Sequence, residues 1–141
     1  MAAVNRRQVL IGAAVAGVVW NAWSLFIDIF ILGQRYTAAQ QADQFLSQPR
    51  YPAFVVQWIV MLFLLSAICS CLYASVRATM GPGPLTALKV GAVLGFLAGF
   101  PVNFALATWM PLDRVFPLWW MLELWVGAIL ATLVAGWFYK D

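Results

Sequence analysis

The sequence predicts an all-α, polytopic membrane protein, a bundle of four transmembrane helices with both termini on the cytoplasmic side. Hydrophobic residues make up 65% of the 141 residues and charged residues 9%, whereas soluble domains are about a quarter charged. Four apolar runs are each long enough to cross a bilayer, which takes about 20 helical residues. These runs use most of the chain, so residues 1–141 are expected to form a single transmembrane domain.

Three prolines mark where helices begin. Proline lacks a backbone N–H and has a fixed φ, so it is favoured at the start of a helix. Pro52, Pro84 and Pro117 stand just before the second, third and fourth apolar runs. The helices are expected over residues 8–32, 53–76, 85–109 and 118–139, with an outer loop over 33–52 whose polar stretch 36–48 can form a short surface helix.

The basic residues predict the orientation, because cytoplasmic loops of inner-membrane proteins carry an excess of Lys and Arg. With the N-terminus inside, five basic residues lie on the cytoplasmic side and three outside. They are Arg6, Arg7, Arg77, Lys89 and Lys140 inside, and Arg35, Arg50 and Arg114 outside. We therefore expect an N-in, C-in protein of the bacterial inner membrane. The net charge of +3 is attributed to this rule and to anionic lipid, not to nucleic acid.

Arg6 and Arg7 precede a run rich in Ala and Gly, as in a twin-arginine export signal. The apolar run continues to Leu32, which is longer than the apolar region of a signal peptide, and no small-x-small cleavage site follows it. An uncleaved first helix is therefore expected, and a targeting role of the two arginines stays open.

Small residues at four-residue spacing indicate how the helices pack. Without a hydrophobic force between helices in lipid, close backbone approach through small residues matters more. The expected packing positions are Gly17, Gly91, Gly95, Gly99, Gly127 and Ala131. Pro101 lies inside the third helix and cannot donate to the Leu97 carbonyl, so a kink is expected there.

A short internal repeat relates the first and third helices. Ala16-Gly17-x-x-x-Asn21 is matched by Ala98-Gly99-x-x-x-Asn103. The match fits either duplication of a helical hairpin, as in parallel-repeat transporters, or chance similarity between helices rich in Ala and Gly.

Each expected helix carries one hydrogen-bonding side chain near its outer end. At 1.5 Å per residue, all four lie roughly 6–9 Å below the outer boundary of the span. This polar layer comprises Asp28, Gln57, Asn103 and Glu123, extended inward along the first helix by Asn21 and Ser24. An unpaired carboxylate at such a depth is costly, so Asp28 and Glu123 are expected to point inward and find partners. The outer residues Arg35, Arg50 and Arg114 are candidates to reach down to them.

Three interpretations of the polar layer remain open. It can be a hydrogen-bonded network that sets helix register, a site for a polar or cationic ligand or a proton-coupled solute, or a layer that meets another subunit.

The residue types present limit the chemistry. Histidine is absent, which removes the commonest transition-metal ligand and the most frequent general base. Cys69 and Cys71 lack the spacing of redox pairs and are expected to be small buried packing residues. Gly81-Pro-Gly-Pro lacks the lysine of a phosphate-binding loop. We therefore expect no enzyme, and no catalytic, metal or cofactor-binding residues.

The stretch Leu72-Tyr-Ala-Ser-Val-Arg77-Ala-Thr-Met-Gly81-Pro-Gly-Pro84-Leu-Thr86-Ala87 resembles a family of small, uncharacterised bacterial four-helix membrane proteins. In that family a helix ending in Leu-Tyr and Arg leads to Gly-Pro-Gly-Pro and a Thr-Ala helix start. The terminal Gly136-Trp-Phe-Tyr139-Lys140 is similar as well. The resemblance covers the middle hairpin and the end of the fourth helix. It implies a bacterial four-helix bundle and carries no activity, and Asp28 and Lys89 lie outside its pattern.

The sequence favours a non-enzymatic function. We expect an accessory or stabilising subunit of a larger membrane assembly, in contact with lipid and with other subunits or further copies of the chain. The alternative is a small-solute or proton-coupled transporter that uses Asp28 and Glu123. An accessory subunit should present an apolar face containing Trp or Gly outside its own bundle. A transporter should hold a wet cavity around Asp28, Asn103 and Glu123.

Overall fold

The computed structural model describes residues 4–139, so Lys140, counted above among the inner charges, lies outside the described residues. The elements, in chain order, are α1 (Arg6–Phe26), a π-helical turn η1 (Ile27–Ile31), α2 (Gly33–Gln41), α3 (Phe54–Met80), α4 (Pro84–Trp109) and α5 (Val115–Phe138). Four helices, with η1 continuing the first, are long and apolar enough to cross a membrane. The predicted all-α bundle is therefore confirmed, and its helices indicate a multi-pass membrane protein.

The helix boundaries differ from the expected ones by a few residues. Pro84 is the first residue of α4, as expected. Pro117 lies in the first turn of α5, which already begins at Val115, because the N–H groups of a first turn need no helical partner. α3 begins at Phe54 and extends to Met80, four residues past the expected end. It ends at Gly81, whose φ of 84° few other residues adopt.

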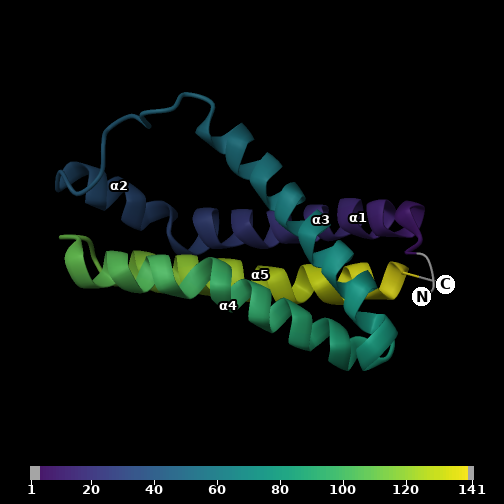
Figure 1. Cartoon of the computed structure of the whole chain (residues 1–141). Coiled ribbons are helices and arrows are strands. Elements are labelled where there is room, and N and C mark those ends of the chain that lie inside the picture. The colour runs from purple at the N-terminus through teal and green to yellow at the C-terminus, as the bar shows by residue number, and fades with distance from the viewer. Residues whose placement is uncertain (1–3, 140–141) are drawn as a thin grey trace.

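The other three long helices pack around α5 (Figure 1). α5 packs along α4 on one side and along α1 on the other, and α3 crosses α1 and α5 obliquely. Both termini lie at one end of the bundle, here called the termini end, and α2 and the turn 110–114 lie at the other, called the α2 end. α3 and α4 meet near their short connection and diverge towards the α2 end.

Glycines set the close approach of α4 to α5. A Cβ on Gly91 would lie 2.7 Å from the Ile129 Cα, and one on Gly95 would lie 2.7 Å from the Trp125 Cα. A Cβ on Gly99 would lie 3.0 Å from a backbone oxygen of α5. Since backbone atoms cannot yield as flexible side chains do, these three positions determine the distance between the helices.

The other small residues receive bulky side chains or fill the core. The Phe63 ring of α3 packs on Gly17, and the Trp20 ring of α1 packs on Gly127. Ala131 has no exposed surface and lies with Trp20 in the central cluster of buried residues. α4 continues through Pro101 and changes direction part-way along its length (Figure 1), as a helix-interior proline requires.

Burial was correctly expected for one cysteine and wrongly for the other. Cys69 is buried and Cys71 is exposed. Residues two apart on a helix diverge by about 200°, so both cannot face the same core.

The polar stretch after α1 closes the α2 end. η1 is a single π-helical turn whose last bond runs from the Leu32 N–H to the Ile27 carbonyl, 3.0 Å. α2 follows at once and packs through a buried cluster of Ile27, Leu32, Ala39 and Phe116. A short helix is thus present in the expected stretch, as α2, but the expected bounds 36–48 were wrong, because the helix covers Gly33–Gln41 and the residues directly after it are not helical. α2 lies over the cavity described next.

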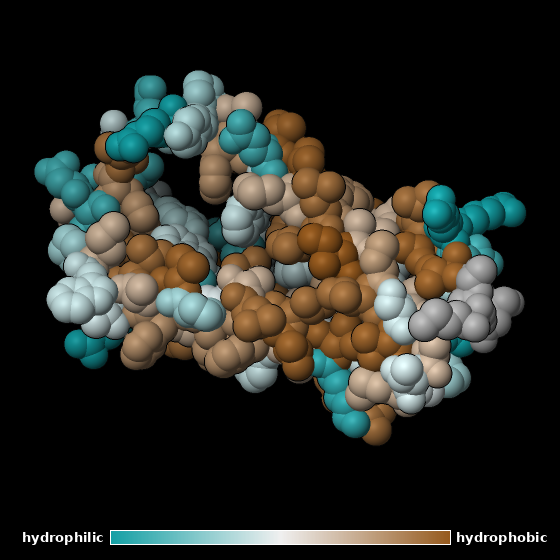
Figure 2. Space-filling model, in the orientation of Figure 1, coloured by the Kyte–Doolittle hydropathy of each residue, from teal (hydrophilic) through white to brown (hydrophobic). Residues whose placement is uncertain are grey.

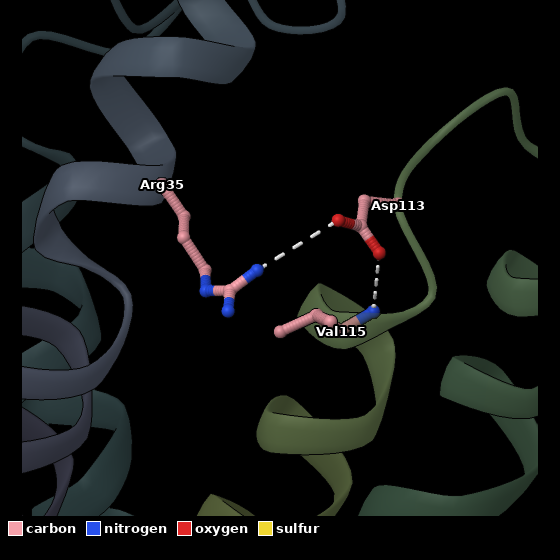
Figure 3. Close-up of polar contacts among 3 residues, drawn as sticks. All are labelled: Arg35, Asp113 and Val115. Atoms are coloured by element: carbon pink, nitrogen blue, oxygen red, sulfur yellow. Dashed lines mark hydrogen bonds and ion pairs between the residues drawn. The ribbon is translucent and has the colours of Figure 1, made fainter.

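An ion pair on the surface of the α2 end joins α2 to the turn before α5 (Figure 3). Arg35 of α2 lies 3.9 Å from the Asp113 carboxylate, with both side chains about half exposed. Asp113 also accepts a hydrogen bond of 3.0 Å from the Val115 N–H at the start of α5. Asp113 therefore links α2 to the first turn of α5.

Candidate functional site

A cavity of about 750 Å³ opens at the α2 end of the bundle. Figure 2 shows the molecule hollowed beneath the connection from α2 to α3. Its walls come from η1, α2, the connection after α2, α3, α4 and α5. The polar lining residues are Asp28, Tyr36, Gln40, Asn103 and Glu123. The apolar and aromatic lining residues are Phe45, Leu46, Pro49, Phe54, Trp58, Ala98, Val102, Trp120 and Leu124.

The geometry of the helices creates this space. α3 leans away from α4 towards the α2 end, while α4 stays against α5. The connection over residues 42–53 then spans from α2 back to the displaced start of α3 (Figure 1). Three residues of this arch, Phe45, Leu46 and Pro49, line the cavity.

Glu123 is held by a relay of hydrogen bonds through three helices. Its side chain is 2% exposed. The Ser24 hydroxyl of α1 donates to Glu123 Oε1 at 2.5 Å, and the Trp58 indole of α3 donates to Ser24 Oγ at 3.1 Å. A serine hydroxyl has one proton, so Ser24 accepts from the indole and donates to the carboxylate.

Asp28 is held by a second relay of the same kind. The Tyr36 hydroxyl of α2 donates to Asp28 Oδ1 at 3.1 Å, and the Trp120 indole of α5 donates to the Tyr36 hydroxyl at 2.9 Å. Burial raises the pKa of Tyr36 well above its usual range, so the phenol keeps the proton that Asp28 accepts.

The two relays share one order, from indole N–H to hydroxyl to carboxylate. Each supplies a neutral donor to one carboxylate oxygen, so neither carboxylate is neutralised by the relay itself. Within residues 4–139, no Lys or Arg lines the cavity. Of the three outer arginines, Arg35 pairs with Asp113 on the surface, and Arg50 and Arg114 are absent from the cavity lining.

The remaining polar-layer residues divide into two sets. Asn103 lines the cavity, with its amide donating to the Gly99 carbonyl at 2.7 Å. Asn21 makes the same local bond to the Gly17 carbonyl at 2.8 Å, as its place in the sequence repeat suggests, but it lies outside the cavity lining. Gln57 is exposed and takes no part in the relays. The structure thus brings Asp28, Asn103, Ser24 and Glu123 together and leaves Gln57 outside.

Sequence reasoning missed the three aromatic members of the relays. Trp58 and Trp120 lie at the depth of an interfacial aromatic belt, and Tyr36 lies in the polar outer stretch, so each has an ordinary reason to be there. The one available signal is that Trp58 directly follows Gln57. Neighbouring helical residues point about 100° apart, so a small rotation of the helix turns Trp58 inward in place of Gln57.

Comparisons of the chain with known protein families, with curated proteins and with solved structures find no match. The residues of the cavity themselves indicate its chemistry. Two carboxylates, two carboxamides and several aromatic rings face a largely apolar space. Carboxylates attract cations and aromatic faces bind them through the ring quadrupole, so the cavity suits a positively charged group.

Proposed function

We propose that this protein is a small-solute transporter of the bacterial inner membrane and that the cavity at the α2 end is its solute-binding site. The observation that carries the proposal is the cavity itself. If this chain is a transporter, a cavity around Asp28, Asn103 and Glu123 is expected, and all three residues line this cavity. Its volume of about 750 Å³ lies in the range of ordinary ligand pockets, about 300–1,000 Å³.

The buried carboxylates support a role beyond packing. A charged side chain within a span is costly, and such residues mark ligand and ion paths in membrane proteins. Neutral donors from Ser24 and Tyr36 offset part of this cost. A cationic solute, or protons carried in exchange for a solute, would neutralise the pair.

The packing below the cavity supports an alternating mechanism. Trp20, Leu62, Ala128 and Ala131 are buried in the core between the cavity and the termini end. At that end Tyr139 accepts a hydrogen bond of 3.0 Å from the Asn5 N–H. Solute bound at Glu123 therefore has access from the α2 end, and its release at the other end requires the helices to move.

The proposed orientation is N-in and C-in. Arg6, Arg7, Arg77 and Lys89 lie at or near the termini end, and Lys140 adds a further charge in the sequence. Arg35, Arg50 and Arg114 lie at the α2 end. The larger count belongs on the cytoplasmic side, so the cavity opens in the outer half of the membrane.

The accessory-subunit alternative receives less support. Trp109 and Trp137 are largely exposed, but they lie at the ends of α4 and α5, where an aromatic belt is expected. The glycine stripe of α4 is used within the bundle, against α5. Neither the exposed tryptophans nor the α4 glycines therefore indicate a surface for a partner subunit.

The experiment begins with gentle extraction of the native membrane and the mass and composition of the particle. The purified protein is then placed in liposomes, and uptake of labelled choline, tetraphenylphosphonium, glycine and glutamate is measured. We expect a particle made of this chain alone and uptake of at least one solute. Glu123→Gln and Asp28→Asn should abolish uptake while the thermal unfolding midpoint stays near that of the wild type.

Gln57→Ala is the matched control, because Gln57 lies at the same depth outside the cavity. It should transport as the wild type does. A stoichiometric set of other proteins together with no uptake of any solute would replace the transporter by the accessory subunit. Unchanged uptake in Glu123→Gln and Asp28→Asn would mean that the solute-binding site lies elsewhere in the protein.

A further inference from the structure

We infer that the solute of this cavity is an amphipathic organic cation, a single ammonium or phosphonium centre on an apolar body, and that it enters sideways from the bilayer between α3 and α4. The inference rests on the proposed function, since it assigns the solute of the same cavity and the path by which it arrives.

The division of the cavity walls defines the ligand chemistry. Asp28 and Glu123 provide two carboxyl groups, and the rings of Trp58, Trp120 and Phe54 line the space around them. Most of the remaining lining is aliphatic. A positive centre would be held by the carboxylates and the aromatic faces, while an apolar body would cover walls that a small hydrated ion leaves in contact with water.

The charge of the lining separates this ligand from a phospholipid. A zwitterionic lipid headgroup brings a phosphate together with its ammonium group, and phosphate sites use Arg, Lys or helix N-terminal amides. No Lys or Arg lines this cavity within residues 4–139, and both charged lining residues are acidic. The cavity therefore favours a net cation over a phosphate-bearing headgroup.

The water-facing side of the cavity is roofed by packed aromatic side chains. Phe45 of the arch stacks edge-on against Phe116, with ring centroids 5.0 Å apart, and lies 5.8 Å from the Tyr36 ring. The Gln40 amide donates to the Leu46 carbonyl at 3.2 Å, which ties the arch to α2. Tyr36 is itself held by Trp120 and Asp28. The roof is thus joined to α2 and α5 by several contacts.

The cavity also has an opening between α3 and α4. Phe54 and Val102 line the cavity and are 47% and 62% exposed on the molecular surface, comparable with Leu46 of the arch at 60%, so they form a lateral mouth beside the roof. Phe54 belongs to α3 and Val102 to α4, the two helices that diverge here (Figure 1). Both lie in helices long and apolar enough to span the membrane, so this mouth meets lipid. A ligand soluble in the outer leaflet can reach Glu123 without displacing the roof.

The binding test uses tetraphenylphosphonium as the probe, with the protein in lipid nanodiscs and empty nanodiscs as the blank. We expect saturable binding that quenches tryptophan fluorescence. Tetramethylammonium, which lacks an apolar body, and triphenylphosphine oxide, which lacks charge, should bind more weakly. Glu123→Gln should weaken tetraphenylphosphonium binding about tenfold or more, the scale of one lost charge-assisted contact. Gln57→Ala should bind normally.

The route is tested by the rate of association measured in a stopped-flow instrument. Val102→Trp narrows the lateral mouth and should slow association of tetraphenylphosphonium. Val93→Trp is its matched control, since Val93 is a similarly exposed valine on the same helix outside the cavity lining, and should leave the rate unchanged. Equal association rates in the wild type and Val102→Trp would overturn lateral access.

The outcomes separate this inference from the proposed function. Tetraphenylphosphonium that binds at Glu123 but is not taken up by liposomes supports the ligand class and contradicts transport. Choline or glycine uptake without tetraphenylphosphonium binding supports transport and overturns the ligand class. Phosphatidylcholine that co-purifies with the protein and is released from it by tetraphenylphosphonium would assign the site to a lipid headgroup instead.

Discussion

Ser24 joins three helices through a single hydroxyl group. It accepts a hydrogen bond from Trp58 and donates one to Glu123, while its own helix supplies the backbone. The side chain is 2% exposed, so water has little access to replace either bond. Hydrogen bonds to charged groups are worth more than neutral ones, and a buried group left without its partner costs its full desolvation.

Ser24→Ala is expected to lower the free energy of unfolding by about 2 kcal/mol, because both Glu123 and Trp58 lose a buried partner. The measurement is SDS-induced unfolding in mixed micelles, with the tryptophan emission maximum recorded in the folded state. The control is Ser75→Ala, since Ser75 is exposed and bonds only the Cys71 carbonyl of its own helix. Equal unfolding curves for the two variants would mean that Ser24 contributes no more than an exposed serine.

Residues outside the relays show how similar patterns acquire different roles. Asn21 and Asn103 each bond a glycine carbonyl one turn back on their helices. Only Asn103 lines the cavity, because α4 borders the space that α3 leaves open. The local contact is a property of the sequence motif, and the position beside the cavity is a property of the helix arrangement.

At the scale of elements, the α4–α5 pair is the most extensive contact of the bundle. Its closeness depends on Gly91 and Gly95, where an added Cβ would lie 2.7 Å from backbone atoms of α5. Real Cβ atoms do not approach so closely, and a helix backbone cannot adjust by a rotamer change. α4 must therefore move away from α5 if either glycine gains a side chain.

Gly95→Leu is expected to destabilise the protein by about 3 kcal/mol or more through this separation. The thermal unfolding midpoint in detergent and the yield of folded protein report the loss. Val93→Leu changes a neighbouring exposed residue of the same helix and should leave both values near those of the wild type. A Gly95→Leu protein as stable as Val93→Leu would contradict the close approach of α4 to α5 at Gly95.

The π-helical turn η1 is the element that connects the core to the roof. Its bond from Leu32 N–H to Ile27 carbonyl closes one wide turn, and Asp28 lies inside it. Single π-turns within α-helices occur often at functional sites. Here the turn carries Asp28, whose carboxylate accepts from Tyr36 of the helix that follows.

At the scale of the whole molecule, the two ends differ in charge and in shape. At the termini end the Arg77 guanidinium lies 4.7 Å above the centre of the Tyr139 ring, and both residues border a smaller pocket of about 320 Å³. The α2 end holds the cavity and its roof. The distribution of Lys and Arg, five against three in the sequence, predicts that the cavity faces the outside.

This orientation is tested with single cysteines in a variant that carries Cys69→Ala and Cys71→Ser. Gln44 and Thr79 are exposed residues near opposite ends of the bundle. In intact spheroplasts, a membrane-impermeant maleimide should label Gln44→Cys and spare Thr79→Cys until the membrane is permeabilised. The reverse pattern would place the cavity on the cytoplasmic side and make the molecule N-out, C-out.

The sequence by itself determined the class of molecule, its four spans and the glycines that face other helices. These follow from local quantities, namely the length of an apolar run, the spacing of Gly and the position of a proline such as Pro84. The depth of Asp28, Asn103 and Glu123 also follows from counting residues along a helix, because the rise per residue is constant.

The tertiary structure decided which of those polar residues meet and what surrounds them. The rotation of each helix about its axis turns Trp58 inward and Gln57 outward, and the divergence of α3 from α4 opens the space that they border. Tyr36 reaches Asp28 because α2 folds back over the bundle after a π-turn. Rotation, divergence and folding back depend on contacts between segments distant in sequence, so no local pattern in the chain specifies them.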